Sequence, residues 1–299
     1  MRAVPRVVER TSESAKLRVI PRLRELYAYR EILANLVRKG LKVKYTASVL
    51  GAVWSLLNPL VFLAVFTFVS RVMGNNIPNY PVYLLSGLLA WNLFNVSITA
   101  STRSVVDNAN LVKKVYFPRE LLPLSAIGEA LVDFVLQMSV LILFMIVTGY
   151  GFHPANLALL PLVVFDLFTF TTGMAFLFAA LNVRYRDVQY LVGLGMIVWF
   201  WLTPIVYPSH FVQEQAARIG SRIDLFAVYL LNTMDDIIEG FHRALSGVVQ
   251  PRAGTVILVD ASLGWLAAVL ATAAVASLLL AWLTWRVFFT LSGDFAEEL

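Results

Sequence analysis

Three carboxylates lie within strongly apolar stretches of the sequence. Glu129 and Asp133 are four residues apart, which places them on one face of a helix, and Asp166 lies inside a second apolar stretch. A carboxylate inside a membrane-spanning helix is costly and usually faces the interior of the bundle. The three could form a proton relay, or Glu129 and Asp133 could be structural partners of nearby cations; we favour the second, because no histidine or lysine in these stretches completes a relay. The nearby cations are Arg103, Arg184 and Arg186.

Motifs for bond-making chemistry are absent from the 299 residues. The sequence contains no cysteine, which excludes thiolate metal sites and cysteine nucleophiles, and its three histidines are scattered. HExxH, GxSxG and the phosphate-cradling GxxxxGK[ST] are also missing, as is any DxD-like cluster of a glycosyltransferase. We therefore predict no catalytic residue and no metal site. Any work that this chain performs must draw on energy supplied from elsewhere.

The polar residues belong to a chain that is too apolar for a soluble globule. Hydrophobic residues make up 59% and charged residues 14%, and the mean hydropathy is +0.74. Crossing a bilayer takes about 20 helical residues, and six apolar segments reach that length. They cover residues 53–72, 83–101, 121–148, 157–183, 188–207 and 262–289. The expected fold is an all-α integral membrane protein with six transmembrane helices.

Basic residues predict the orientation of these spans. Twelve of the 24 lysines and arginines precede residue 53, and the segments 103–120 and 184–187 add four and two. Cytoplasmic loops of membrane proteins carry such an excess of basic residues. We expect cytoplasmic N- and C-termini, a location in the cytoplasmic (inner) membrane, and a basic cytoplasmic extension over residues 1–28. No signal peptide is expected.

Ahead of the first span, residues 29–45 combine apolar residues at helical spacing with cations between them. This pattern predicts an amphipathic helix at the cytoplasmic interface, with its apolar face in the acyl boundary and its cations near anionic headgroups. The helix could simply anchor the chain, or it could receive the phosphates of a lipid-linked substrate where that substrate enters. The cations are Arg30, Arg38, Lys39, Lys42 and Lys44.

The segment 103–120 between the second and third spans is polar, compatible with a helix, and interrupted by Pro118. It is longer than a turn between two helices requires. We therefore favour a docking surface for another protein over a solvated loop. Its candidate contact residues are Asn110, Lys113, Lys114, Arg119 and Glu120.

The connection between the fifth and sixth spans, residues 208–261, is too long for a passive loop. Apolar residues recur at helical spacing within residues 225–245. We interpret the region as external re-entrant helices that form a gate, since such a backbone is tolerated where protein or a watery cavity surrounds it. A helix lying on the membrane surface is the alternative.

Aromatic residues make up 13% of the chain. Most of them must face lipid or pack between helices, but aromatic rings also stack on the apolar faces of sugars, so some could line a glycan path. The candidates are Trp54, Trp91, Phe94, Trp199 and Tyr207.

Four stretches, taken together and in this order, resemble the permease family of ABC transporters that export lipid-linked polysaccharides of the O-antigen, teichoic acid and galactan types. They are KVKYTASVLGAVWSLLNPL at 42–60, YFPRELLPL at 116–124, LNVRYRDVQYL at 181–191 and TPIVYP at 203–208. The resemblance extends from about residue 29 to the C-terminus. Their placement relative to the spans makes the set specific, although each stretch alone is degenerate.

The resemblance implies that residues 29–299 are a transmembrane permease domain that forms a homodimer with two ATP-binding cassette subunits. ATP and Mg²⁺ would bind to those subunits, and this chain would bind no cofactor. The helix within residues 103–117 would be the coupling helix seated in an ATPase cleft. The substrate would be a lipid-linked glycan moved from the cytoplasmic to the outer leaflet, with membrane lipids and no nucleic acid as further partners.

Two other functions remain open from the sequence. The chain could be an ABC permease that exports a small hydrophobic compound, which shares the broad architecture. It could also be an ion-coupled secondary transporter that uses Glu129, Asp133 and Asp166.

Overall fold

The computed structural model describes residues 19–46, 51, 53–72, 80–152, 154–207, 209, 212, 231–247 and 262–299. The described residues form helices, and no strand occurs among them, which confirms the all-helical fold class. Four helical segments are long and apolar enough to cross a membrane. They are α4 (Tyr80–Asp107), α6 (Leu121–Val147), the segment Pro154–Arg184 that contains α7 (Pro154–Leu157) and α8 (Leu160–Arg184), and α13 (Leu263–Leu291).

The other two expected spans are shorter apolar helices. The apolar part of α3 (Val53–Val72) covers Trp54–Val69, and α9 covers Val188–Leu202. With 15 residues, α9 is about 22 Å long, against a hydrocarbon core of about 30 Å. The expected span 188–207 is thus too long for the helix: Thr203 adopts an extended backbone because Pro204 follows it. A count of six spans remains a prediction.

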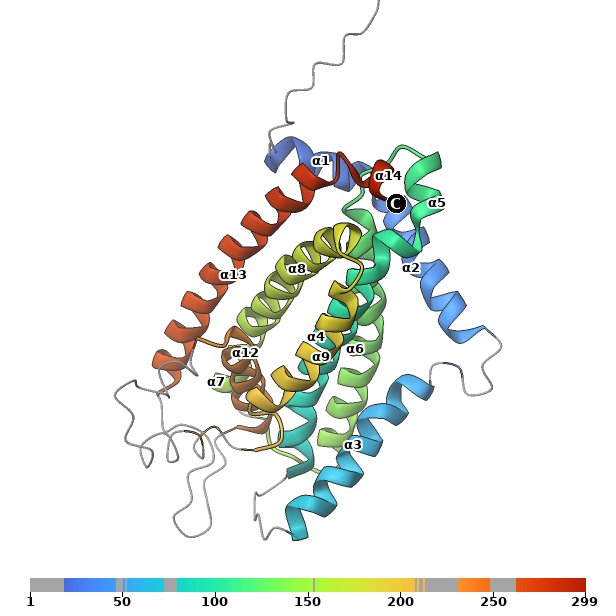
Figure 1. Cartoon of the computed structure of the whole chain (residues 1–299). Coiled ribbons are helices and arrows are strands. Elements are labelled where there is room, and N and C mark those ends of the chain that lie inside the picture. Colours follow the sequence, from blue (N-terminus) through green and yellow to red (C-terminus); the bar gives the residue numbers. More distant parts are fainter. Residues whose placement is uncertain are drawn as a thin grey trace, which may run out of the picture.

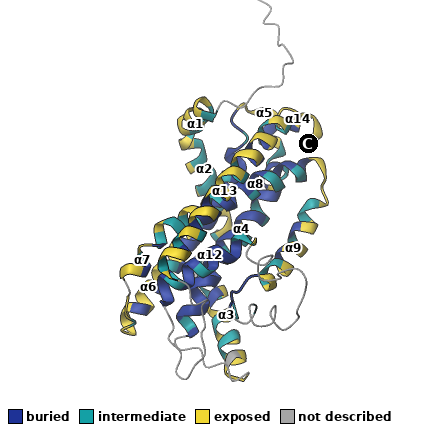
Figure 2. Ribbon diagram, turned by 90° about the vertical axis from the view of Figure 1, so that its left-hand side faces the viewer, coloured by how far each residue is buried: buried dark blue, intermediate teal, exposed yellow. Residues whose placement is uncertain are grey.

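Helix α4 is the centre of the bundle. Of its most apolar 18-residue window, 78% of the residues are buried, whereas the corresponding share in α13 is 28%. Helix α4 packs on α6 and α8, and α13 packs on the other side of α8. Figure 2 shows the consequence: α13 and α9 keep exposed outer faces, while α4 and α12 (Thr233–Phe241) are largely buried. The apolar outer faces are those expected of helices in contact with lipid.

Two helices precede the first apolar segment. Residues 19–28 of the expected basic extension form α1 (Val19–Ala28), and α2 (Arg30–Tyr45) follows after Tyr29; the rest of the extension lies outside the described residues. Helix α2 packs closely on α6, where a Cβ atom at Gly40 would lie 1.8 Å from Glu129 Oε1. Apolar residues of α2 thus contact the protein core at Leu33 and Leu36. This corrects the expectation that the apolar face of this helix rests in lipid.

The two ends of the bundle are formed by different helices. We call one end, formed by α1, α5 (Ala109–Lys114), α14 (Phe295–Glu298) and the C-terminus, the α5 end, and the opposite end, formed by α7, α12 and the π-helix η1 (His242–Ser246), the α12 end (Figure 1). Most of the expected gate region 208–261 lies outside the described residues. Among its described residues, α12 with η1 is largely buried against α4, α8 and α13. It is therefore not an exposed surface helix, and its re-entrant character remains a prediction.

Candidate functional site

Helix α5 presents the predicted docking residues at one end of the bundle. Helix α4 continues to Asp107, so the helix expected within residues 103–117 is reduced to the six residues of α5. Val112 and Phe117 are buried and anchor α5 and the segment after it in the core. Asn110, Lys113 and Lys114 are exposed on its outer face. The arrangement places two cations on a firmly anchored, protruding turn (Figure 1), and their role in coupling remains a prediction.

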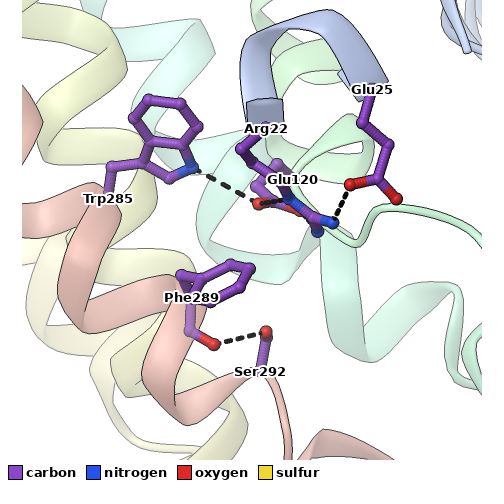
Figure 3. A network of polar contacts seen from close by, with 6 residues as sticks. All are labelled: Arg22, Glu25, Glu120, Trp285, Phe289 and Ser292. Atoms are coloured by element: carbon purple, nitrogen blue, oxygen red, sulfur yellow. Dashed lines mark hydrogen bonds and ion pairs between the residues drawn. The ribbon is translucent and has the colours of Figure 1, made fainter. Parts of the chain in front are cut away.

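Glu120, which sequence reasoning placed on the same surface, is instead completely buried. The Arg22 guanidinium donates two hydrogen bonds to it, from Nε to Oε1 at 2.8 Å and from Nη2 to Oε2 at 2.7 Å. Trp285 Nε1 donates a third, to Oε1 at 3.3 Å. Figure 3 shows this carboxylate between α1 and α13. Glu120 is thus placed to join α1 to α13 rather than to contact a second protein.

Arg22 is the centre of this network. Its Nη1 also contacts Glu25 Oε2 at 2.6 Å, and its guanidinium lies 5.0 Å from the Phe289 ring centre (Figure 3). Burial lowers the pKa of Arg22, but the hydrogen bonds and charges of Glu120 and Glu25 outweigh burial and raise it overall. The Arg22 guanidinium therefore stays charged at all physiological pH values.

Arg119 is half-buried beside this network. Its Nη1 is 3.5 Å from the carbonyl oxygen of Gly293, and its guanidinium is 6.0 Å from the Phe295 ring centre. Burial lowers the pKa of Arg119, although not enough for an arginine to lose its proton. The residue links the segment before α6 to the C-terminal helix.

Asp133 pairs with a cation that sequence reasoning had assigned to lipid headgroups. Lys44 Nζ lies 2.5 Å from Asp133 Oδ2, while Tyr45 Oη and Ser55 Oγ donate to Oδ1 at 2.6 and 2.9 Å. Burial lowers the pKa of Lys44, but the ion pair with Asp133 raises it overall. The structural interpretation of Asp133 thus fits the geometry, but with a different cation. Within the described part of the chain, Arg103, Arg184 and Arg186 form no ion pair with these carboxylates.

The polar contacts continue from Asp133 toward the bundle interior. Gln137, one turn further along α6, donates from Nε2 to the Ser55 carbonyl oxygen at 2.6 Å and accepts from Asn92 Nδ2 at 3.2 Å. Because Asn92 lies on α4, this chain of contacts joins α2, α3, α6 and α4. The sequence does carry one signal for it, since Glu129, Asp133 and Gln137 repeat every four residues and so form a polar stripe on α6.

The remaining two carboxylates have different surroundings. Glu129 is partly exposed and faces Gly40 of α2. Asp166 is completely buried near the α12 end, where Ser277 Oγ donates to its Oδ1 at 2.5 Å. Within the described ranges, Asp166 Oδ2 has no hydrogen-bond partner, and no three His, Asp or Glu side chains gather to hold a metal ion. The absence of a metal site remains a prediction.

Like Lys44, the other cations of α2 are exposed, but they have no carboxylate partner among the described residues. Arg38, Lys39 and Lys42 form no ion pair with a described residue, and Arg30 lies over the Tyr27 ring at 4.8 Å. They remain available to anionic groups.

The predicted path aromatics separate into different environments. Phe94 is completely buried and packs against Phe170 and Trp199, and Trp199 Nε1 donates to Asn232 Oδ1 at 2.9 Å, which ties α9 to the start of α12. Trp54 is 57% exposed, and Tyr207 Oη donates to the Trp201 carbonyl oxygen. The predicted path aromatics Trp54, Phe94, Trp199 and Tyr207 line neither of the two described pockets.

Trp91 lines a pocket of about 400 Å³ between α3, α4 and α9. We call it the aromatic pocket. Its other rings are Phe62, Phe66, Phe200 and Trp201, and its polar side chains are Asn58, Asn92, Asn95 and Thr99. Sequence reasoning missed most of this set, because rings on three separate helices show no common pattern along the chain. Flat rings interleaved with amides suit a ligand that has both apolar faces and hydroxyl groups.

Comparisons with known proteins agree with the helical architecture. A family model described as ABC-2 type transporter matches residues 32–234. The O-antigen export system permease protein RfbA of Myxococcus xanthus is 38% identical over 200 residues, which are 66% of this chain and 75% of that protein. A protein of the same name from Klebsiella pneumoniae is 37% identical over 192 residues, which are 63% of this chain and 73% of that protein.

Proposed function

The chain belongs to the ABC-2 type transporter family, and from this membership we propose that it exports a lipid-linked polysaccharide. As a homodimer with two ATP-binding subunits, it would move a glycan of the O-antigen, teichoic acid or galactan type from the cytoplasmic to the outer leaflet of the inner membrane. The similarity to O-antigen export permeases supports the substrate class. The chain is a transport permease rather than an enzyme.

The aromatic pocket is the structural observation that carries this proposal. Trp91 and Phe200 meet edge to face at 5.7 Å, and Phe62 stacks on Phe66 at 5.8 Å. Sugar rings offer apolar faces for such stacking, and Asn92 and Asn95 offer amides for sugar hydroxyls. A small hydrophobic compound would offer no hydroxyl groups to form hydrogen bonds with these amides.

The energy would come from ATP bound with Mg²⁺ to the partner subunits, because these 299 residues contain no phosphate-binding loop. We assign the contact with the partner to Asn110, Lys113 and Lys114 on α5. The anchors Val112 and Phe117 connect this turn to the core. Movement of α5 would therefore reach α4 and α6, as coupling between two sites requires.

Substrate entry is assigned to the exposed cations of α2, namely Arg30, Arg38, Lys39 and Lys42. They suit the phosphates of a lipid-linked glycan at headgroup depth. In this orientation the α5 end is cytoplasmic and the α12 end faces outward, with α12 as part of the gate.

Co-purification of the chain with its partners in mild detergent tests the proposal. The wild-type chain should carry a stoichiometric ATP-binding subunit, and the double reversal Lys113→Glu with Lys114→Glu should lose it while the protein still inserts in the membrane. The matched reversal Lys39→Glu with Lys42→Glu, on α2, should keep the ATP-binding subunit but block glycan export. A wild-type chain that never carries an ATP-binding subunit, even after crosslinking, would overturn the proposal.

Depletion of the chain separates the two exporter functions. Lipid-linked glycan should accumulate on the cytoplasmic side of depleted cells. Unchanged glycan levels would favour the export of a small hydrophobic compound.

A further inference from the structure

A groove of about 870 Å³ lies beside α5 at the α5 end of the bundle. One wall consists of α5 and the segment that follows it. The other wall is formed by the end of α13 and by the C-terminal residues, including Thr290 and Ala296, and Arg22 of α1 lies at its edge. We call it the C-terminal groove. The wall elements α1, α13 and α14 lie outside the residues that match the family model.

The C-terminal groove is a built feature rather than a gap between mobile ends. Phe295 of α14 is completely buried and packs edge to face on Phe288 at 5.4 Å. Arg119 bridges the two walls through the Gly293 carbonyl oxygen. The Glu120–Arg22 ion pair with Trp285 (Figure 3) joins α1 to α13 at the groove, which Arg22 lines.

The charge of the groove is positive. Its lining holds four cations, Arg22, Lys113, Lys114 and Arg119, against the single carboxylate of Asp294. Arg22 is neutralised by Glu25 and Glu120, whereas Lys113 and Lys114 form no ion pair with any described residue. Beside them, Tyr116 is 87% exposed. An exposed tyrosine ring is typical of a protein contact surface, and unpaired cations beside it attract a partner segment of opposite charge.

We propose that the C-terminal groove receives an acidic segment of the ATP-binding subunit, so that the C-terminal helix and α1 hold the partner together with α5. This inference rests on the proposed function and adds to it the partner's chemistry and a second contact wall. The positive charge of the groove lining favours a protein segment that carries carboxylates.

Thr290 offers a matched pair of variants, because it is exposed, lies in the groove wall, and is distant from the exposed face of α5 in sequence. In Thr290→Glu a carboxylate would oppose the acidic segment, and we expect binding of the purified ATP-binding subunit to weaken about tenfold. Thr290→Gln has nearly the same size without the charge and should bind as the wild type does. Equal binding by the two variants would overturn the inference.

The absence of native cysteine permits a second, direct measurement. A single cysteine at Ala296, which lines the groove, is labelled with a photo-crosslinker in the assembled complex, and the same is done at Glu297, the next residue of α14 and not a lining residue. Position 296 should crosslink to a peptide of the ATP-binding subunit rich in Asp and Glu, and position 297 much less. Crosslinks from 296 to lipid alone, or to a peptide without acidic residues, would contradict the inference.

A cysteine at Asn110 separates this inference from the proposed function. If Asn110 crosslinks to the ATP-binding subunit while Ala296 does not, the proposed function stands and the groove assignment fails. If neither position crosslinks and no ATP-binding subunit co-purifies, the proposed function itself fails and the inference fails with it.

Discussion

Two buried carboxylates on the α1 and α2 side of the bundle differ from Asp166, which lies near the α12 end. Glu120 and Asp133 each bind a cation, Arg22 and Lys44, which belongs to a helix that precedes the first apolar segment. Asp166 instead accepts a hydrogen bond from the Ser277 hydroxyl. A buried ion pair becomes costly when one partner is removed, whereas a carboxyl group held by a hydroxyl can be exchanged for an amide of the same shape. Glu120 and Asp133 therefore hold helices in place, whereas the site of Asp166 should tolerate a substitution better.

Removal of the Glu120 carboxylate should have the largest effect. Glu120→Ala leaves the Arg22 guanidinium and the Trp285 indole NH without their acceptor, and we expect a loss of about 3 kcal/mol in unfolding free energy. Thermal unfolding in mild detergent measures it. Glu25→Ala is the matched control, since it removes the other carboxylate of the same arginine from a more exposed site and should cost about 0.5 kcal/mol. Equal losses in both variants would show that burial of Glu120 adds nothing.

The Lys44–Asp133 pair should give a smaller loss, because the Lys44 side chain is 44% exposed. Asp133→Leu removes the shared acceptor of three donors, and we expect a loss of about 2 kcal/mol. The double variant Lys44→Met with Asp133→Leu should recover part of the loss, since no cation is then left without a partner. A double-mutant cycle in detergent measures the coupling. Strictly additive losses would mean that the ion pair contributes nothing of its own.

Long apolar runs made the larger helices predictable from the sequence. The expected span 121–148 is α6 at Leu121–Val147, and 262–289 is α13 at Leu263–Leu291, because a continuous run of apolar helix formers has few other ways to satisfy its backbone in lipid. Span 188–207 was predicted too long, because the apolar run continues past Pro204, where the helix cannot. The burial of α12 could not be predicted, since Asp235 and Asp236 indicate an exposed helix.

The site was predicted in residue type but not in pairing. The spacing of Glu129 and Asp133 indicated a shared helix face, and a cationic partner for Asp133 was expected. Its identity depends on packing: Lys44 is 89 residues from Asp133, and Arg22 is 98 residues from Glu120. Gly40 allows α2 to approach α6 closely enough to deliver Lys44. No local sequence pattern predicts this contact between α2 and α6.

Replacement of Asp166 should have the smallest effect. In Asp166→Asn the amide oxygen can keep the hydrogen bond from Ser277, and the new NH₂ group takes the place of Oδ2, which has no partner among the described residues. We expect a change of less than about 1 kcal/mol in unfolding free energy, and unchanged glycan export. Ser277→Ala is the sharper variant, since it leaves a buried carboxylate without its donor and should cost about 1–2 kcal/mol.

The same variant also decides between the exporter and the ion-coupled carrier. An ATP-driven exporter has no need of a titratable group at position 166, so Asp166→Asn should transport as well as the wild type. If it folds normally but transport is lost, the ion-coupled alternative gains support. If instead its stability falls as far as that of Glu120→Ala, Asp166 must bind a cation from outside the described residues, and the contrast between the two regions disappears.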